Sequence, residues 1–137
     1  MSSKPQLIMQ IATFQTQMFK RVDQFLSPHG ISFSELMVLS HLANAPNRTL
    51  RRIDLANQTG LTASGVTRLL NPMEKTGLVQ KEQNPRDARV SLVRLSAAGE
   101  RIYNEAMVSF TDCADSILKP LGSSQIATLS KLMQVLN

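Results

Sequence analysis

The sequence has little of several residue types that define other classes of protein. Its 137 residues include one cysteine, Cys113, and two histidines, and tryptophan is absent. One thiol cannot form an internal disulfide, and together with two scattered histidines it cannot complete a zinc site of the usual composition. We therefore expect no metal site and a reducing, cytoplasmic setting.

Long apolar runs are also missing. The longest run has four residues, Leu36–Leu39, whereas a membrane-spanning helix needs about 20. The N-terminal segment lacks the uninterrupted hydrophobic stretch of a secretory signal, because Gln10 breaks it. We expect no membrane partner. Hydrophobic residues still make up 42% of the chain, which at this length predicts a single folded domain over residues 1–137.

The net charge of +5 is concentrated in the middle of the chain. Residues 46–101 contain ten cationic residues and five acidic ones, whereas the charges on either side nearly cancel. Eight of those ten cations are arginine, whose planar fork binds phosphates and guanine edges through two hydrogen bonds. This bias favours a nucleic-acid partner, and a solvated basic surface is the alternative interpretation.

The spacing of apolar residues predicts a mainly α fold with a small β-hairpin. Apolar side chains recur at helical intervals in six stretches, at about residues 7–26, 33–43, 50–58, 62–76, 97–118 and 124–136. Ser32 with Glu35 forms a capping-box pattern, Ser96 is a candidate N-cap, and Ser123 or Ser124 is expected to cap the last helix. Two strands joined by a turn at Asn84–Arg89 are expected in between. The predicted order is α-α-α-α-β-β-α-α.

The two ends of the chain have wide apolar faces that the central part can cover only partly. These ends are residues 1–28 and 100–137, and they flank a central lobe of residues 46–101. Exposed apolar area of this extent usually marks an interface. We therefore expect a homodimer joined through the chain ends. Packing of the two ends on each other within one chain is the alternative.

Residues 50–70 contain the spacing of a helix-turn-helix. Ala56 is small enough for two helices to cross closely, Gly60 tolerates the positive φ of a tight turn, and Val66 packs the second helix onto the first. The other side of the second helix is then available to the major groove of DNA. That side carries Thr62, Ala63, Ser64, Thr67 and Arg68. For each hydroxyl alone, a capping or solvated role is the simpler interpretation.

In these features the chain resembles the MarR family, the multiple-antibiotic-resistance regulators, which are winged helix-turn-helix transcription regulators. The resemblance covers nearly all 137 residues, and the hairpin turn is its most specific part. The segments that resemble the family are Ala56–Gly60, Ser64–Arg68, Met73–Val79, Asn84–Arg89 and Leu95–Gly99. The chain departs from the family pattern at Asn84, where aspartate is usual, and at Ala88, where arginine is frequent.

The resemblance implies a fold of six helices and a two-stranded wing. It also implies that the protein is a repressor whose homodimer binds a palindromic operator in double-stranded DNA. Asp87 would brace the wing, Arg89 would enter the minor groove, and Arg86 is a further candidate contact. A small aromatic or phenolic effector that binds in a crevice near His41 would cause the protein to release the DNA. A lone histidine is more often structural, and Cys113 is better explained by packing than by redox sensing.

Two other classes of function compete with DNA binding. An enzyme is not expected, because no catalytic residue pattern, phosphate-cradling glycine loop or metal-binding motif is present, so we expect no catalytic residues and no cofactor. A winged helix that binds protein or RNA is the remaining alternative, because a fold does not fix its partner. Arg68 and Arg89, on the two elements that would face the grooves, favour duplex DNA.

Overall fold

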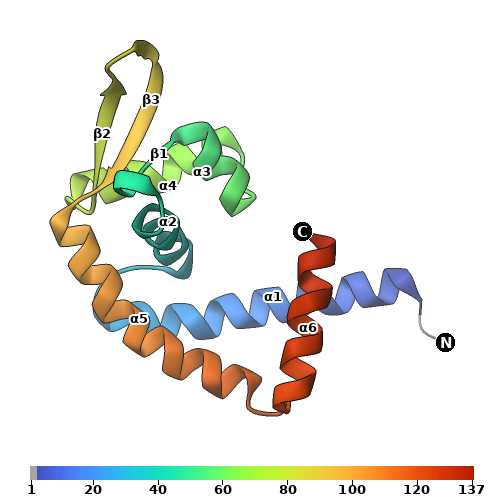
Figure 1. The fold of residues 1–137 in the computed structure, drawn as a ribbon. Helices are drawn as coiled ribbons and strands as arrows, with labels where there is room; N and C mark the ends of the chain where they lie inside the picture. Colours follow the sequence, from blue (N-terminus) through green and yellow to red (C-terminus); the bar gives the residue numbers. More distant parts are fainter. Residues whose placement is uncertain (1–2) are drawn as a thin grey trace.

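The structure, a computed structural model, describes residues 3–137. These residues form six α-helices and a three-stranded antiparallel sheet (Figure 1). The helices are α1 (Lys4–Leu26), α2 (Phe33–Ala43), α3 (Arg52–Thr59), α4 (Ala63–Lys75), α5 (Ala97–Leu118) and α6 (Ser123–Leu136). The strands are β1 (Thr49–Arg51), β2 (Val79–Asn84) and β3 (Asp87–Leu95), and the 3-10 turns are η1 (Ser27–His29) and η2 (Pro46–Arg48). The predicted mainly α fold with a β-hairpin is confirmed.

Local capping signals fix where the helices begin. At α2, the Ser32 hydroxyl accepts from the Glu35 amide at 3.2 Å and the Glu35 carboxylate accepts from the Ser32 amide at 2.8 Å, so the predicted capping box is confirmed. Ser96 caps α5 as predicted. The prediction for α6 was wrong, because the residue before the helix is Gly122. Its amide donates to Gln125 Oε1 at 2.9 Å, which is the half of a capping box that needs no side chain on the cap residue.

The sheet contains one strand that the sequence pattern did not predict. A helix was expected from about residue 50, but residues 49–51 form β1 and α3 begins at Arg52. β1 pairs antiparallel with β3, with Leu50 opposite Val93, and β3 lies between β1 and β2. Three residues are too few to show an alternating pattern. The strand depends on the edge of β3, which comes much later in the chain.

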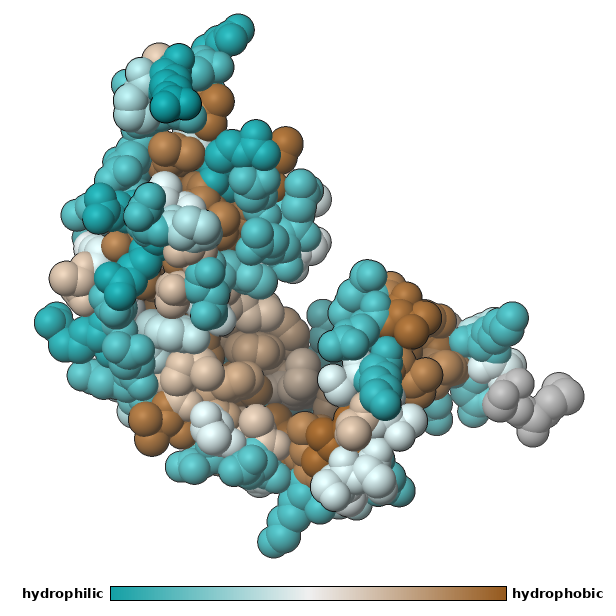
Figure 2. Space-filling model, viewed as in Figure 1, coloured by the Kyte–Doolittle hydropathy of each residue, from teal (hydrophilic) through white to brown (hydrophobic). Residues whose placement is uncertain are grey.

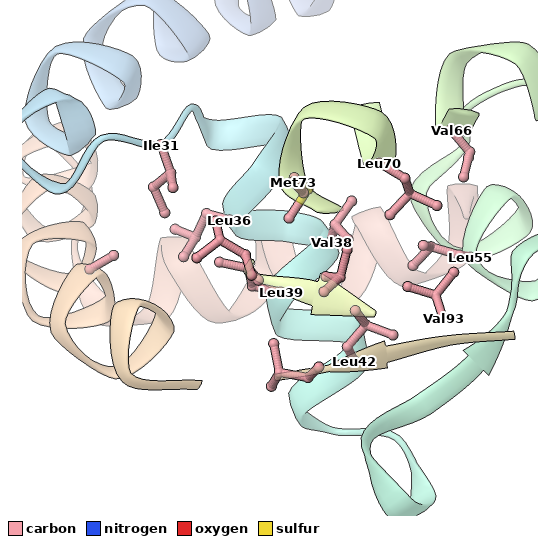
Figure 3. Close-up of a cluster of buried hydrophobic side chains, with 14 of the residues drawn as sticks. Ile31, Leu36, Val38, Leu39, Leu42, Leu55, Val66, Leu70, Met73 and Val93 are labelled. Carbon is pink, nitrogen blue, oxygen red and sulfur yellow. The ribbon is translucent and has the colours of Figure 1, made fainter. Parts of the chain in front are cut away.

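The hydrophobic core lies around α2, which is buried on more than one side as predicted. Its side chains Leu36, Val38, Leu39 and Leu42 are almost fully buried. They pack with side chains from α3, α4 and β3, among them Leu55, Leu70, Met73 and Val93 (Figure 3). Burial of each such side chain stabilises the fold by about 1.5–3 kcal/mol. This core sets the positions of α3, α4 and the sheet relative to one another.

The outer helices form a second part of the molecule. α1 and α5 lie side by side, and α6 turns away from them (Figure 1). Cys113 is buried on α5, as expected, and its burial raises the pKa of its thiol although Arg21 opposes the effect. A thiol of this kind is a weak nucleophile. Across residues 3–137, no helix has the length and hydropathy required to span a membrane.

Gly99 allows the start of α5 to lie against the turn between α4 and β2. A Cβ at this position would collide with the carbonyl oxygen of Leu78 and lie 2.8 Å from Leu95 Cδ1. The Leu78 carbonyl cannot easily move, because it accepts hydrogen bonds from both the amide and the hydroxyl of Ser96.

We therefore expect Gly99→Ala to lower the free energy of unfolding by about 1–3 kcal/mol. This is the opposite of the gain of about 1 kcal/mol that the same change gives at an exposed helical site. Urea denaturation measures the difference. Asn104→Ala, at an exposed position of the same helix, is the control and should leave the stability nearly unchanged. Equal stability of Gly99→Ala and the wild type would contradict the close contact.

Candidate nucleic-acid interface

The helices α3 and α4 form a tight helix-turn-helix. Ala56 is buried at the crossing, and its carbonyl accepts hydrogen bonds from the amides of both Gly60 and Leu61. Gly60 has a φ of 75°, the left-handed conformation that favours glycine. Val66 is 2% exposed and lies in the core. The structure thus places Ala56, Gly60 and Val66 at the crossing, the turn and the packed face, respectively.

The N-terminus of α4 presents short polar side chains to solvent. Thr62 caps the helix, because its Oγ1 accepts from the Gly65 amide at 3.0 Å, and this oxygen lies 3.2 Å from Ser64 Oγ. Ala63 and Ser64 are exposed in the first turn. The first backbone amides of a helix have no partner within it, so this end favours an anionic group such as a phosphate.

Thr67 and Arg68 differ in what their side chains contact. The Thr67 hydroxyl donates to the Ala63 carbonyl at 3.2 Å and accepts from Arg52 Nη1 at 3.1 Å. Its proton is therefore already used within the protein. Arg68 is exposed and, among residues 3–137, forms no ion pair. Arg68 has all of its guanidinium donors available to a ligand.

The hairpin of β2 and β3, called the wing below, projects from the molecule beside α3 and α4 (Figure 1). Asp87 Oδ1 accepts from both the amide and Nε of Arg89, at 3.0 and 3.1 Å. This hydrogen-bonded Arg89 side chain lowers the pKa of the Asp87 carboxyl. Asn84 Oδ1 accepts from the Arg86 amide at 2.9 Å, so asparagine makes a turn-stabilising bond without a negative charge.

The positive charge of the central lobe is partly neutralised by ion pairs. Five of its arginines pair with acids: Arg48 with Glu100, Arg51 with Asp54, Arg52 with Glu74, Arg89 with Asp87, and Arg94 with Glu82. Arg89 nevertheless has a side chain that is 92% exposed. Arg68 and Arg86 are exposed and unpaired within the described chain. These three side chains, on α4 and the wing, form the cationic face of the lobe.

Sequence reasoning missed two polar residues that support this face. Arg52 and Glu74 pair at 3.2 Å although 22 positions separate them. Each side chain is only 21% exposed. No local spacing signals such a contact, since it arises from the packing of α3 on α4.

A cavity of about 380 Å³ lies between η1, α2, α4 and α5. Its lining includes His29, Glu35, Pro72, Thr76, Leu78 and Ile102. His29 is held by a 2.8 Å hydrogen bond between its Nε2 and Ser109 Oγ. His41, the histidine proposed from the sequence, is partly buried on α2 and does not line this cavity. A role for His41 in a pocket stays a prediction.

A model of the MarR family matches residues 29–90, which include α2 to the first half of the wing. The HTH-type transcriptional regulator FarR of Neisseria gonorrhoeae is 33% identical over 65% of this chain and 61% of its own length. The chain spans between about half and three fifths of the length of the first curated relatives that it matches.

Two solved structures share the fold along nearly the whole chain. One is a mutant MarR of E. coli complexed with operator DNA, with a TM-score of 0.87, 24% identity, and coverage of 95% of this chain and 92% of that one. The other is Sco3205 of Streptomyces coelicolor in complex with DNA, with a TM-score of 0.89, 23% identity, and coverage of 99% and 87%. The chain therefore has the fold of these two regulators, and its residues 29–90, which contain the helix-turn-helix and the first strand of the wing, are similar to the MarR family.

Proposed function

We propose that the protein is a sequence-specific transcription regulator that binds double-stranded DNA as a homodimer. The observation that carries the proposal is the cationic face: exposed Arg68 on α4 and exposed Arg86 and Arg89 on the wing belong to one lobe. FarR bears the name of a transcriptional regulator, and two structures of the same fold hold DNA. A regulator of this kind acts in the cytoplasm by binding rather than by catalysis.

The recognition helix of this proposal is α4. Thr62, Ala63 and Ser64 are short, so the backbone at this end of α4 can approach the floor of the major groove. The α4 amides and the Ser64 hydroxyl then contact phosphate, and Arg68 donates two hydrogen bonds to a guanine edge. Thr67 contributes mainly through its contact with Arg52.

The wing supplies the minor-groove contact. Asp87 holds Arg89 through hydrogen bonds from its amide and its Nε. The exposed guanidinium enters a narrow minor groove, whose negative potential attracts it. Narrow grooves are typical of A·T-rich DNA, so the operator is expected to have such flanks. Arg86 adds a phosphate contact near the turn.

The homodimer is proposed from the apolar side chains at the two chain ends. Every residue of α6 is exposed in the described chain, although the helix carries Leu129, Leu132 and Met133. Figure 2 shows hydrophobic atoms where α6 crosses α1 in this view, and Leu7 and Ile8 of α1 are also exposed. A second copy would cover this surface. The two α4 helices would then lie about one turn of DNA, roughly 34 Å, apart.

Repression and release complete the proposal. A dimer that occupies two successive grooves blocks other proteins from the operator, so the bound state represses. The cavity beside His29 is lined by residues of η1, α2, α4 and α5, and its volume of about 380 Å³ is in the range of small-ligand sites. A small aromatic or phenolic effector in this cavity would change the position of the lobe and release the DNA.

The function is tested by selecting duplexes from a randomised pool with the wild-type protein. We expect an inverted repeat whose affinity falls steeply with salt. Arg68→Ala should weaken binding and reduce the discrimination between bases at one position of each half-site by about 1–3 kcal/mol. Arg89→Ala should weaken binding more evenly across sequences. Electrophoretic mobility shifts measure both. Equal binding to any polyanion, or preferential binding to single-stranded RNA or to a protein, would contradict the proposal.

The Asp87–Arg89 pair makes the stability of the wing depend on pH. Because the pKa of Asp87 is lowered in the folded wing, the carboxylate supports the wing above the usual aspartate pKa of about 4. That support is lost as the pH falls through the lowered value. Carboxyl NMR should find the pKa of Asp87 below the usual value in the wild type and higher in Arg89→Ala, where only the amide of residue 89 still donates to the carboxylate. An ordinary pKa in both would contradict the pairing.

Dimerisation is tested by sedimentation equilibrium. We expect a species of about twice 15.1 kDa for the wild type. Leu132→Lys places a charge within the apolar surface of α6 and should give monomers, because a buried unpaired charge is costly. Lys131→Ala, at the adjacent exposed position of α6, is the control and should stay dimeric. Only monomers of the wild type would contradict the dimer.

A further inference from the structure

Resting on the proposed function, we propose that Arg52 and Glu74 are positioning residues that give the protein its preference for one DNA sequence. Together they connect three elements, α3, α4 and β2. They hold the recognition helix at a fixed orientation relative to the wing. Sequence preference requires the two DNA-contacting elements to reach their grooves in one geometry, so it depends on this connection.

Arg52 connects α3 to two separate turns of α4. Its Nη1 donates to Thr67 Oγ1 at 3.1 Å, and its Nη2 donates to Glu74 Oε1 at 3.2 Å. Thr67 and Glu74 lie two helical turns apart, so one planar guanidinium fixes both the position of α4 along its axis and its rotation about that axis. Lysine cannot replace this contact, because its single ammonium group lacks the rigid fork.

Glu74 extends the connection to the wing. While Oε1 accepts from Arg52, Oε2 lies 3.6 Å from Lys81 Nζ on β2. The carboxylate thus bridges the last turn of the recognition helix and the first strand of the wing. Its side chain is 21% exposed, so solvent screens the interaction less than it screens a fully exposed pair. Glu74 is the one residue that contacts both cations of this network.

A direct DNA contact explains this arrangement less well. The Arg52 side chain is also only 21% exposed, and two of its donors are used within the protein. The carboxylate of Glu74 would repel a phosphate. Removal of this carboxylate should therefore strengthen DNA binding if Glu74 acts through its charge alone. It should weaken binding to the selected duplex if Glu74 positions α4 and the wing.

The test compares Glu74→Gln and Arg52→Lys with the wild type. The probes are the inverted-repeat duplex selected above and a shuffled duplex of the same composition, each measured by fluorescence anisotropy at two salt concentrations. Glu82→Gln is the charge-matched control, because Glu82 lies on β2 and pairs with Arg94 instead. Thermal unfolding and sedimentation show that each variant is folded and has the wild-type oligomeric state. Both test substitutions are conservative in size.

We expect Glu74→Gln and Arg52→Lys to lower the ratio of selected to shuffled affinity by about tenfold, the size of effect that one weakened base contact gives. The salt dependence should stay unchanged. Glu82→Gln should bind both duplexes equally well or slightly more tightly, with the same ratio. Tighter binding of both duplexes by Glu74→Gln, or an unchanged ratio in both test variants, would overturn the proposal. A wild type without preference for the selected duplex would instead overturn the proposed function.

Discussion

The burial of α2 is the constraint on which the rest of the structure depends. Leu36, Val38, Leu39 and Leu42 are on different sides of this short helix, and all are almost fully buried. Because α3, α4, β3 and α5 all contact α2, one hydrophobic core positions both the helix-turn-helix and the base of the wing. The elements that contact DNA in the proposed function are therefore held by one rigid core, as a sequence-specific surface requires.

Polar contacts further fix the relative positions of the helices and strands that pack around the core. The carbonyl of Leu78 accepts from Ser96, and Gly99 lets α5 begin directly against it. Arg52 and Glu74 connect α3, α4 and β2. None of these contacts involves Arg68 or Arg86, which form no ion pair within the described residues. Arg89 combines two roles, because it pairs with Asp87 within the wing and is 92% exposed.

The order of the helices and the hairpin was predictable because its signals are local. The Ser32–Glu35 capping box, the Ser96 cap and the apolar spacing of α1 all lie within a few residues of what they determine. β1 was not predictable, because its partner strand comes much later in the chain. The same holds for the Arg52–Glu74 pair and for the cavity beside His29, where sequence reasoning chose His41. Contacts between distant residues depend on the packed fold.

The central claim is that a dimer presents two recognition helices and two wings to one face of DNA. Hydroxyl-radical footprinting of the selected duplex tests it most directly. The account predicts protected segments related by two-fold symmetry, with half-site centres about one helical turn, roughly 10 base pairs, apart, and loss of the outer protections in Arg89→Ala. A single asymmetric protected segment, or outer protections that persist in Arg89→Ala, would contradict it.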